Sequence, residues 1–326
     1  MHRRSLIAAG LGSAFLATPH VARAAARPIK IGHNNTTTSI MHVAAMAMGD
    51  ALRTASGGRL TLDVHSDAVL GSEAQMVSAV GAGSLDMTLG PIGSVSALAR
   101  EIALTEMPYL FRDAAHARAK LDGDLGKHYA ELLAPKDVRV LAFSEIGIRH
   151  ITANRPVATP AALRGLKIRV PLSPAILEGF RAMGAAPGVL PFPQLPEALR
   201  TGQFDAQENP ISMIVSSGLQ RFQSHVTLTR HSYTSGIFLV SNDTWDELDA
   251  EGRAMLRAAA QKGAVASREF NDRVEAEGVA ALRAAGMTVV TEVDRAGFQR
   301  SLEEGQAALS AVFGADAIAR IRALAV

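Results

Sequence analysis

The first third of the chain alternates between strand-like and helix-like segments, and this alternation limits the possible folds more than any other feature. Alternating apolar residues predict strands near residues 29–31, 60–64 and 85–89. Two amphipathic segments lie between them, at 41–52 and at 72–81, and the second opens with a Ser-x-x-Gln capping box. Alternating strands and helices of this length predict an open, largely parallel α/β sheet.

The same pattern restarts in the middle of the chain. Helices are predicted over 159–163 and 173–184, because each segment begins with a Ser or Thr followed by proline, the preferred N-cap and first-turn pair. A strand is predicted between them, over 166–170. Phe192 is expected on an extended segment before a helix that ends at Gly202. These elements predict a second α/β sheet, and therefore a second domain.

A long segment near the C-terminus, residues 249–285, is rich in alanine and charged residues and contains no proline. One unbroken helix of this length would run about 50 Å, which exceeds the size of a small domain. Such a helix would have to cross between the two domains. Gly252, Gly263 and Gly278 leave open the alternative of two shorter helices.

The first 24 residues have the layout of a secretory signal peptide. Arg3 and Arg4 form a basic start, a short apolar run follows, and Ala22-Arg23-Ala24 fits the cleavage site. The run is shorter than the ~20 residues that span a bilayer, although a short buried helix is an alternative. The paired arginines also suit a twin-arginine signal. We therefore expect a cleaved leader and a periplasmic protein.

The composition excludes several classes of protein. The full chain has 33 basic and 31 acidic residues, and removal of the leader leaves 30 basic residues against 31 acidic. A nearly neutral surface gives no electrostatic footprint for nucleic acid or an anionic membrane. The chain has no cysteine, which excludes disulfides, thiol catalysis and Cys-ligated zinc. A chain of this length can bury a core without such cross-links.

The sequence motifs of common enzymes are absent. The chain has no G-x-S-x-G elbow, no H-E-x-x-H pair and no phosphate-binding G-x-x-x-x-G-K-[ST] loop. Asp63, His65 and Asp67 alternate along one face of a predicted strand, but a solvated face explains them more simply than a metal site. His225 and His231 are six residues apart, which is not a helical ligand spacing. We therefore predict no catalytic residues, no metal and no cofactor.

Two arginines and an asparagine stand where a binding site is expected. Ligands of open α/β sheets bind at the carboxyl ends of the strands, and Arg169 lies at such an end. Its guanidinium must leave the core or meet an anion, and that anion is either a ligand carboxylate or an internal Asp or Glu, between which the spacing does not choose. Arg149 is a second arginine that is a candidate for binding an anion. Asn209 precedes Pro210, which favours either a loop that presents the amide or an ordinary turn.

Several motifs resemble those of the solute-binding proteins of TRAP transporters, the tripartite ATP-independent periplasmic transporters of C4-dicarboxylates and sialic acid. The resemblance covers nearly the whole chain after the leader. The less specific motifs are Gly57-Gly58-Arg59, Leu70-Gly71, residues 83–87 (GSLDM) and residues 107–111 (MPYLF). The most specific are residues 163–171 (LRGLKIRVP) and residues 201–210 (TGQFDAQENP).

The resemblance implies two α/β domains with a ligand cleft between them and a long helix that spans both. It implies that Arg169 pairs with a ligand carboxylate and that Arg149, Asn209 and the aromatic wall Phe192 complete the ligand site. Glu208 and His231 match a supporting polar network around the second arginine, and Asn34 matches a pocket residue of the first domain. The implied domains are residues 25–146 with 235–274, and residues 147–234 with 275–326.

The implied function is the capture of a small organic acid by closure of the two lobes and its delivery to TRAP permease subunits, most simply by a monomer. Two alternatives remain: a ligand-sensing subunit for a membrane receptor and a secreted enzyme acting on an organic acid. Leu172 and Pro91 replace polar residues of the sialic-acid binders, which argues against sialic acid. The sequence does not choose among the other organic acids.

Overall fold

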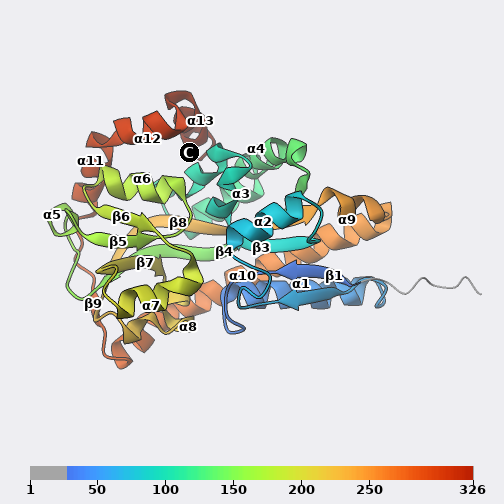
Figure 1. The fold of residues 1–326 in the computed structure, drawn as a ribbon, viewed down its shortest axis with the longest axis horizontal. Helices are drawn as coiled ribbons and strands as arrows, with labels where there is room; N and C mark the ends of the chain where they lie inside the picture. Colours follow the sequence, from blue (N-terminus) through green and yellow to red (C-terminus); the bar gives the residue numbers. More distant parts are fainter. Residues whose placement is uncertain (1–27, 326) are drawn as a thin grey trace, which may run out of the picture.

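The computed structural model describes residues 28–325, so the predicted signal peptide over residues 1–24 lies outside the described part. The described strands form one nine-stranded sheet in the order β2-β1-β3-β8-β4-β7-β5-β6, with β9 paired to β8 (Figure 1). The strands are β1 (Ile29–Gly32), β2 (Leu62–His65), β3 (Met87–Pro91), β4 (Val138–Ala153), β5 (Lys167–Val170), β6 (Ala186–Val189), β7 (Ala206–Pro210), β8 (His225–Ser241) and β9 (Thr288–Val290).

The sheet has two parallel halves joined by antiparallel strands. β1 pairs in parallel with β2 and β3, and β5 pairs in parallel with β6 and β7. We call the half around β1–β3 the first lobe and the half around β5–β7 the second lobe. β8 and β4 lie between them and run antiparallel to each other and to their outer neighbours β3 and β7. The mixed α/β fold agrees with the fold class predicted from the sequence.

The prediction of two separate sheets is wrong, because two long strands belong to both halves. β4 has 16 residues and β8 has 17, so each extends from one lobe into the other. Their shared ladder has register shifts between Val140 and Ala142, between Glu145 and Gly147, and between Arg149 and Ile151. Extra residues at such bulges bend and twist a strand. The two strands therefore connect the lobes through irregular backbone, and we call them the hinge strands.

Helices cover both faces of this sheet (Figure 1). The capping box predicted at Ser72 and Gln75 is present at the start of α2. The α-helices are α1 (Ile40–Ala55), α2 (Glu73–Gly81), α3 (Ala114–Asp122), α4 (Asp124–Leu133), α5 (Pro160–Leu163), α6 (Pro174–Ala182), α7 (Leu195–Arg200), α8 (Ile211–Ser216), α9 (Asn242–Glu247), α10 (Ala250–Ala284), α11 (Arg295–Glu304), α12 (Gln306–Phe313) and α13 (Ala315–Ala325). The 3₁₀ helices are η1 (Ile92–Ala97), η2 (Arg100–Glu106), η3 (Ala134–Lys136), η4 (Phe192–Gln194) and η5 (Leu219–Arg221).

Phe192 thus opens a 3₁₀ turn, and the extended segment predicted for it is wrong, because Pro193 and Pro196 favour the first turns of helices.

The long helix predicted from the sequence is confirmed as α10, a single helix of 35 residues capped by Asp249. The alternative of two shorter helices is wrong, because the glycines serve close packing. A Cβ at Gly263 would lie 2.6 Å from the carbonyl oxygen of Ala44 in α1, and one at Gly278 would overlap Ile211 in α8. Since α1 packs beside the first lobe and α8 follows β7 of the second, α10 spans both lobes.

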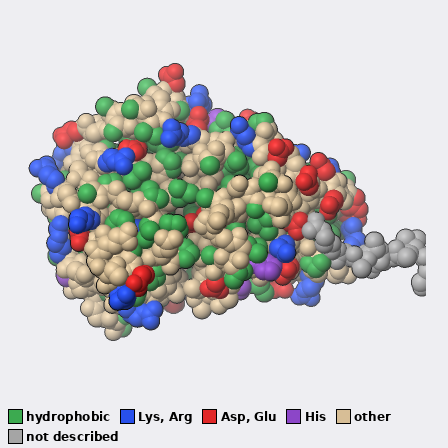
Figure 2. Space-filling view, in the orientation of Figure 1, with side chains coloured by type: hydrophobic (Ala, Val, Ile, Leu, Met, Phe, Trp, Pro, Cys, Tyr) green, Lys and Arg blue, Asp and Glu red, His purple; other side chains and the backbone are tan. Residues whose placement is uncertain are grey.

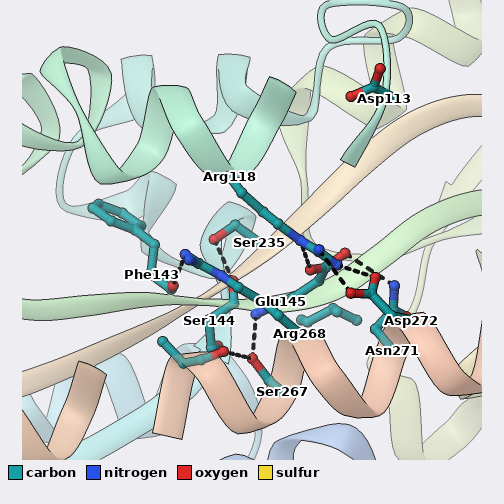
Figure 3. A network of polar contacts seen from close by, with 12 residues as sticks. Asp113, Arg118, Phe143, Ser144, Glu145, Ser235, Ser267, Arg268, Asn271 and Asp272 are labelled. Atoms are coloured by element: carbon teal, nitrogen blue, oxygen red, sulfur yellow. Dashed lines mark hydrogen bonds and ion pairs between the residues drawn. The ribbon is translucent and has the colours of Figure 1, made fainter. Parts of the chain in front are cut away.

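A polar network fastens α10 to the hinge strands (Figure 3). Glu145 on β4 is buried, and its carboxylate accepts hydrogen bonds from Arg118 of α3 at 2.5 Å and from Asn271 of α10 at 3.0 Å. Arg118 also forms an ion pair with Asp272 at 2.6 Å, and Ser267 accepts the Glu145 backbone N–H at 2.9 Å. One end of the hinge is therefore held in place by charge-assisted hydrogen bonds.

Two further observations bear on what the surface can contact. On the face shown in Figure 2, basic and acidic side chains are interspersed, in agreement with the nearly balanced charge of the chain. Within residues 28–325, no helix combines the length and the apolar character needed to cross a membrane.

Candidate functional site

A small cavity lies where the two lobes face each other. Its lining comes from both lobes and from the hinge strand β4. The first lobe contributes Asn35, Met41, Glu73 and Pro91; β4 contributes Ile146 and Arg149; the second lobe contributes Arg169, Pro171, Phe192, Asn209 and Met213. Four of the predicted site residues therefore meet in one cavity: Arg149, Arg169, Phe192 and Asn209. A cavity lined by two lobes changes shape when they move relative to each other.

Arg169 is held as an unpaired cation at the wall of this cavity. Its residue is 1% exposed, and its Nε and Nη2 donate hydrogen bonds to the Leu190 carbonyl oxygen at 2.9 and 2.6 Å. Its Nη1 is buried and has no hydrogen-bond partner. The Phe192 ring lies 5.8 Å from its Cζ. Burial lowers the pKa of Arg169 to about 10, so the side chain remains charged near neutral pH.

The internal salt bridge that the sequence left open for Arg169 is not formed with any described residue. The Leu190 carbonyl orients the guanidinium but neutralises no charge. A buried cation with a free N–H group is costly unless an anion meets it. The geometry therefore favours the other interpretation, a site for an external anion at Nη1.

Arg149 lies at the centre of a buried network that is already complete. Its guanidinium forms a bidentate ion pair with Glu208, with Nη2 to Oε1 at 2.8 Å and a short bond from Nε to Oε2. Nη2 also donates to the Glu208 carbonyl oxygen at 2.7 Å and to Asn209 Oδ1 at 3.2 Å, and Nη1 donates to Thr234 Oγ1 at 3.1 Å. Arg149 therefore positions its neighbours and has less capacity than Arg169 to take up an anion.

His231 extends the network on the side away from the cavity. Its Nε2 lies 3.0 Å from Glu208 Oε2, and its Nδ1 lies 2.8 Å from Thr229 Oγ1. Burial lowers the pKa of His231, and the hydrogen bond to Glu208 opposes that shift; Nε2 must carry a proton to donate to the carboxylate. Burial alone would raise the pKa of Glu208, but Arg149 and His231 outweigh it and hold that pKa below its ordinary value. Glu208 and His231 thus support the site without lining the cavity.

Asn209 and Asn34 lie in positions that differ from those expected from the sequence. Asn209 lies on strand β7, so the loop or turn suggested for it is wrong; its pairing with His150 of β4 requires extended backbone, as Pro210 does. The cavity is lined by Asn35, whereas Asn34 lies beside it and accepts a hydrogen bond from Asn35 Nδ2 at 3.0 Å. The amide oxygen of Asn35 is buried without a partner.

Glu73 is a cavity residue that the sequence reasoning missed. It follows the N-cap Ser72, where an acidic residue is ordinary helix-start chemistry, so only its burial of 6% exposure distinguishes it. Burial raises the pKa of Glu73, and the nearby Arg169 opposes that rise. The cavity thus holds a cation and a carboxyl group together, a pairing suited to ligands with both an anionic and a hydroxylated part.

The described residues form no group of three His, Cys, Asp or Glu side chains able to hold a metal. Asp63 and His65 simply pair with each other at 2.8 Å.

The buried histidine next to Arg149 allows a pH test. Burial lowers the pKa of His150 to about 3, and the nearby side chains of His231, Arg230 and Arg149 act in the same direction, whereas an unfolded chain protonates histidine near pH 6.5. The unfolded state therefore binds more protons below pH 6.5, and the contribution of His150 to stability is lost as the pH falls. Between pH 7 and pH 5, His150→Gln is expected to lose about 2 kcal/mol less free energy of unfolding than the wild type. Urea unfolding at both pH values measures this, and equal losses in the two proteins would contradict it.

The fold and the cavity together define a class, a two-lobed extracytoplasmic binding protein. The model of the bacterial extracellular solute-binding protein family 7 matches residues 31–309, and the chain belongs to this family. It is a binding protein of TRAP transport and not an enzyme.

Individual relatives and solved structures support this family assignment. The chain is 33% identical over 279 residues to the 2,3-diketo-L-gulonate-binding periplasmic protein of Escherichia coli, with 85% of each chain covered. A TRAP solute-binding protein of Polaromonas bound to D-erythronate is 33% identical, with a TM-score of 0.87 over 91% of this chain and 98% of that one. A Roseobacter denitrificans protein with bound L-galactonate is 28% identical, with a TM-score of 0.84 over 91% and 98%.

Proposed function

We propose that the protein captures a small hydroxylated carboxylic acid in the periplasm and delivers it to the permease subunits of a TRAP transporter. The observation that carries this proposal is the unpartnered, buried Nη1 of Arg169, a residue that lines the cavity. An arginine fork holds a carboxylate through parallel charge-assisted hydrogen bonds. Such bonds gain strength when closure of the lobes removes water.

The other polar groups of the cavity indicate which acids fit. Glu73 and the Asn35 amide oxygen are acceptors placed to receive hydrogen bonds from ligand hydroxyl groups. A second ligand carboxylate near Glu73 would meet repulsion or an unpaired acceptor, so hydroxy acids fit better than dicarboxylates. The ligands named for three similar proteins, 2,3-diketo-L-gulonate, D-erythronate and L-galactonate, are oxygenated acids with one carboxylate, whereas another relative, from Rhodobacter capsulatus, is a C4-dicarboxylate-binding protein.

The remaining parts of the proposal concern domains and export. We infer that residues 25–146 with 235–274 and residues 147–234 with 275–326 move as two bodies about β4, β8 and α10, in a monomer. The basic, apolar and A-x-A pattern of residues 1–24 supports export with cleavage, and Arg3-Arg4 suits the twin-arginine route. The periplasmic relatives support that compartment.

A thermal-shift screen of residues 25–326 tests the function. The panel holds aldonic and uronic acids, pantoate, C4-dicarboxylates, and the neutral sugars and alditols that match the acids. An acid at about 100 times its Kd adds about 2.7 kcal/mol of stability, which raises the Tm by a few degrees. We expect shifts from hydroxylated monocarboxylates and none from the neutral partners. Shifts only from neutral sugars would contradict anion capture, and shifts only from dicarboxylates would contradict the role given to Glu73.

A further inference from the structure

A second buried carboxyl group lies between the lobes, outside the ligand cavity. Glu106 closes η2 and is 1% exposed. Its Oε1 accepts a hydrogen bond from Thr234 of β8 at 2.8 Å, and its backbone carbonyl accepts one from Ser232 at 2.8 Å. Its other carboxyl oxygen, Oε2, is buried and has no hydrogen-bond partner. A buried oxygen of this kind calls for a structural or functional reason.

The surroundings of Glu106 Oε2 come from both lobes. Gly93, which follows β3 of the first lobe, approaches so closely that a Cβ there would overlap Oε2. The same Cβ would lie 2.9 Å from the Cβ of Ser173 and 3.2 Å from the Leu172 carbonyl oxygen. Leu172 and Ser173 follow β5 of the second lobe, and Ser173 is the N-cap of α6. Glycine at position 93 therefore allows the segment after β5 to rest directly on the first lobe.

Glu106 is also connected to the ligand site. Thr234 donates its hydroxyl hydrogen to Glu106 and accepts a hydrogen bond from Arg149 Nη1 at 3.1 Å. Arg149 in turn holds Asn209 in the cavity wall, at 3.2 Å. Leu172 and Ser173 follow Arg169 by three and four positions in the sequence. The Glu106 carboxyl group thus lies at the contact between the lobes. It is also linked to Arg149, behind the cavity, through the Thr234 hydroxyl group.

We propose that Gly93, Glu106 and Ser173 form a latch that is completed when the lobes close on the ligand, with Glu106 as the positioning residue that links the latch to Arg149. This inference rests on the proposed function, because it concerns the closed form that holds the ligand. Burial raises the pKa of Glu106, while Arg149 and the Ser173 and Thr234 side chains oppose the rise, which agrees with a carboxyl group enclosed from several sides.

The test places a second carboxylate opposite Glu106. Ser173→Asp keeps an N-cap of equal quality for α6, so the separate lobe should fold normally. In the closed form the new carboxylate faces Glu106 in a buried contact, where like charges repel strongly. At pH 8 we expect at least about a hundredfold weaker affinity. Because the latch acts after encounter, the loss should lie in the dissociation rate constant and not in the association rate constant.

Two matched variants make the result specific. Thr159→Asp places the same charge at the N-cap of α5, on the exposed surface of the same lobe, and should bind as the wild type does. The double variant Ser173→Asp with Glu106→Gln removes the opposing charge and should recover at least about tenfold of the lost affinity. A merely structural role of Ser173 would give no such recovery.

The probes are D-erythronate, L-galactonate and 2,3-diketo-L-gulonate, of which the one that wild-type protein binds most tightly is used for stopped-flow and calorimetric measurements. Wild-type affinity in Ser173→Asp, or no recovery in the double variant, would overturn the latch and leave the proposed function intact. If Ser173→Asp fails to fold, Gly93→Ala replaces it, with Gly49→Ala as control, since a Cβ at Gly49 meets nothing closer than 3.6 Å. Unchanged dissociation in Gly93→Ala would overturn the latch equally. If the wild-type protein binds none of the three, the acid with the largest shift in the thermal-shift screen replaces them, and a wild-type protein that binds no acid of that panel would contradict the proposed function itself.

Discussion

Arg169→Ala is expected to weaken the binding of the captured acid by about 2 to 5 kcal/mol, because the ligand carboxylate loses its buried partner. The effect should be large because Arg169 forms no ion pair with a described residue. The ligand carboxylate is therefore expected to be the anion that neutralises its charge. Arg169→Lys should also bind poorly, since an ammonium group cannot reproduce the fork that Leu190 orients through two hydrogen bonds. Titration calorimetry measures both losses.

Arg164→Ala is the matched control for this prediction. Arg164 lies on the exposed surface of the same lobe, five residues before Arg169, and its removal should leave affinity unchanged. Circular dichroism of each variant checks that the fold is retained. Near wild-type affinity in Arg169→Ala would show that this arginine is a structural residue and that the carboxylate is held elsewhere.

Glu208→Gln is expected to reduce the free energy of unfolding by about 3 to 5 kcal/mol, the cost of leaving a buried charge without its partner. Glu208 is fully buried and accepts hydrogen bonds from both Arg149 and His231. A glutamine of the same shape keeps the packing but removes the charge that Arg149 requires. Urea unfolding at pH 7 measures the loss.

The same substitution at an exposed ion pair provides the comparison. Glu197 pairs with Arg200 one turn along α7, at 2.6 Å, and both side chains are more than 60% exposed. Exposed pairs contribute about 1 kcal/mol at most, so Glu197→Gln should change stability little. Equal effects of the two substitutions would mean that the Arg149 network contributes no more than a surface pair.

Much of the fold follows from local sequence patterns. The capping box at Ser72, the Ser-Pro start at Ser173 and the proline-free segment of α10 each specify an element through chemistry that operates within a few residues. The glycines of α10 wrongly suggested a break into two helices. Gly263 and Gly278 are instead required by close packing against neighbours that the local sequence does not show. The single sheet also escaped prediction, since the pairing of β4 with β8 joins residues about 90 positions apart.

In the candidate site, too, some residues could be predicted from the local sequence and others could not. Arg169 could be selected because a charged residue within an apolar strand is conspicuous, and the family motif around it implied the role. Glu73 and Asn35 were missed because their sequence context is that of ordinary helix starts and turns, and only tertiary packing brings them to Arg169. Whether a polar residue lies in a cavity depends on the lobe opposite it, which no local pattern describes.

The central claim is that a carboxylate meets Arg169 in the cleft, and calorimetric titration of the wild-type protein with an acid and with its primary amide tests this most directly. The acid is the one with the largest shift in the screen, and the amide keeps its shape and hydroxyl groups while losing its charge. We expect the amide to bind at least about a hundredfold more weakly, because a charge-assisted ion pair becomes a neutral contact with a buried cation. An amide that binds as tightly as the acid would contradict the account and leave Arg169 without its proposed role.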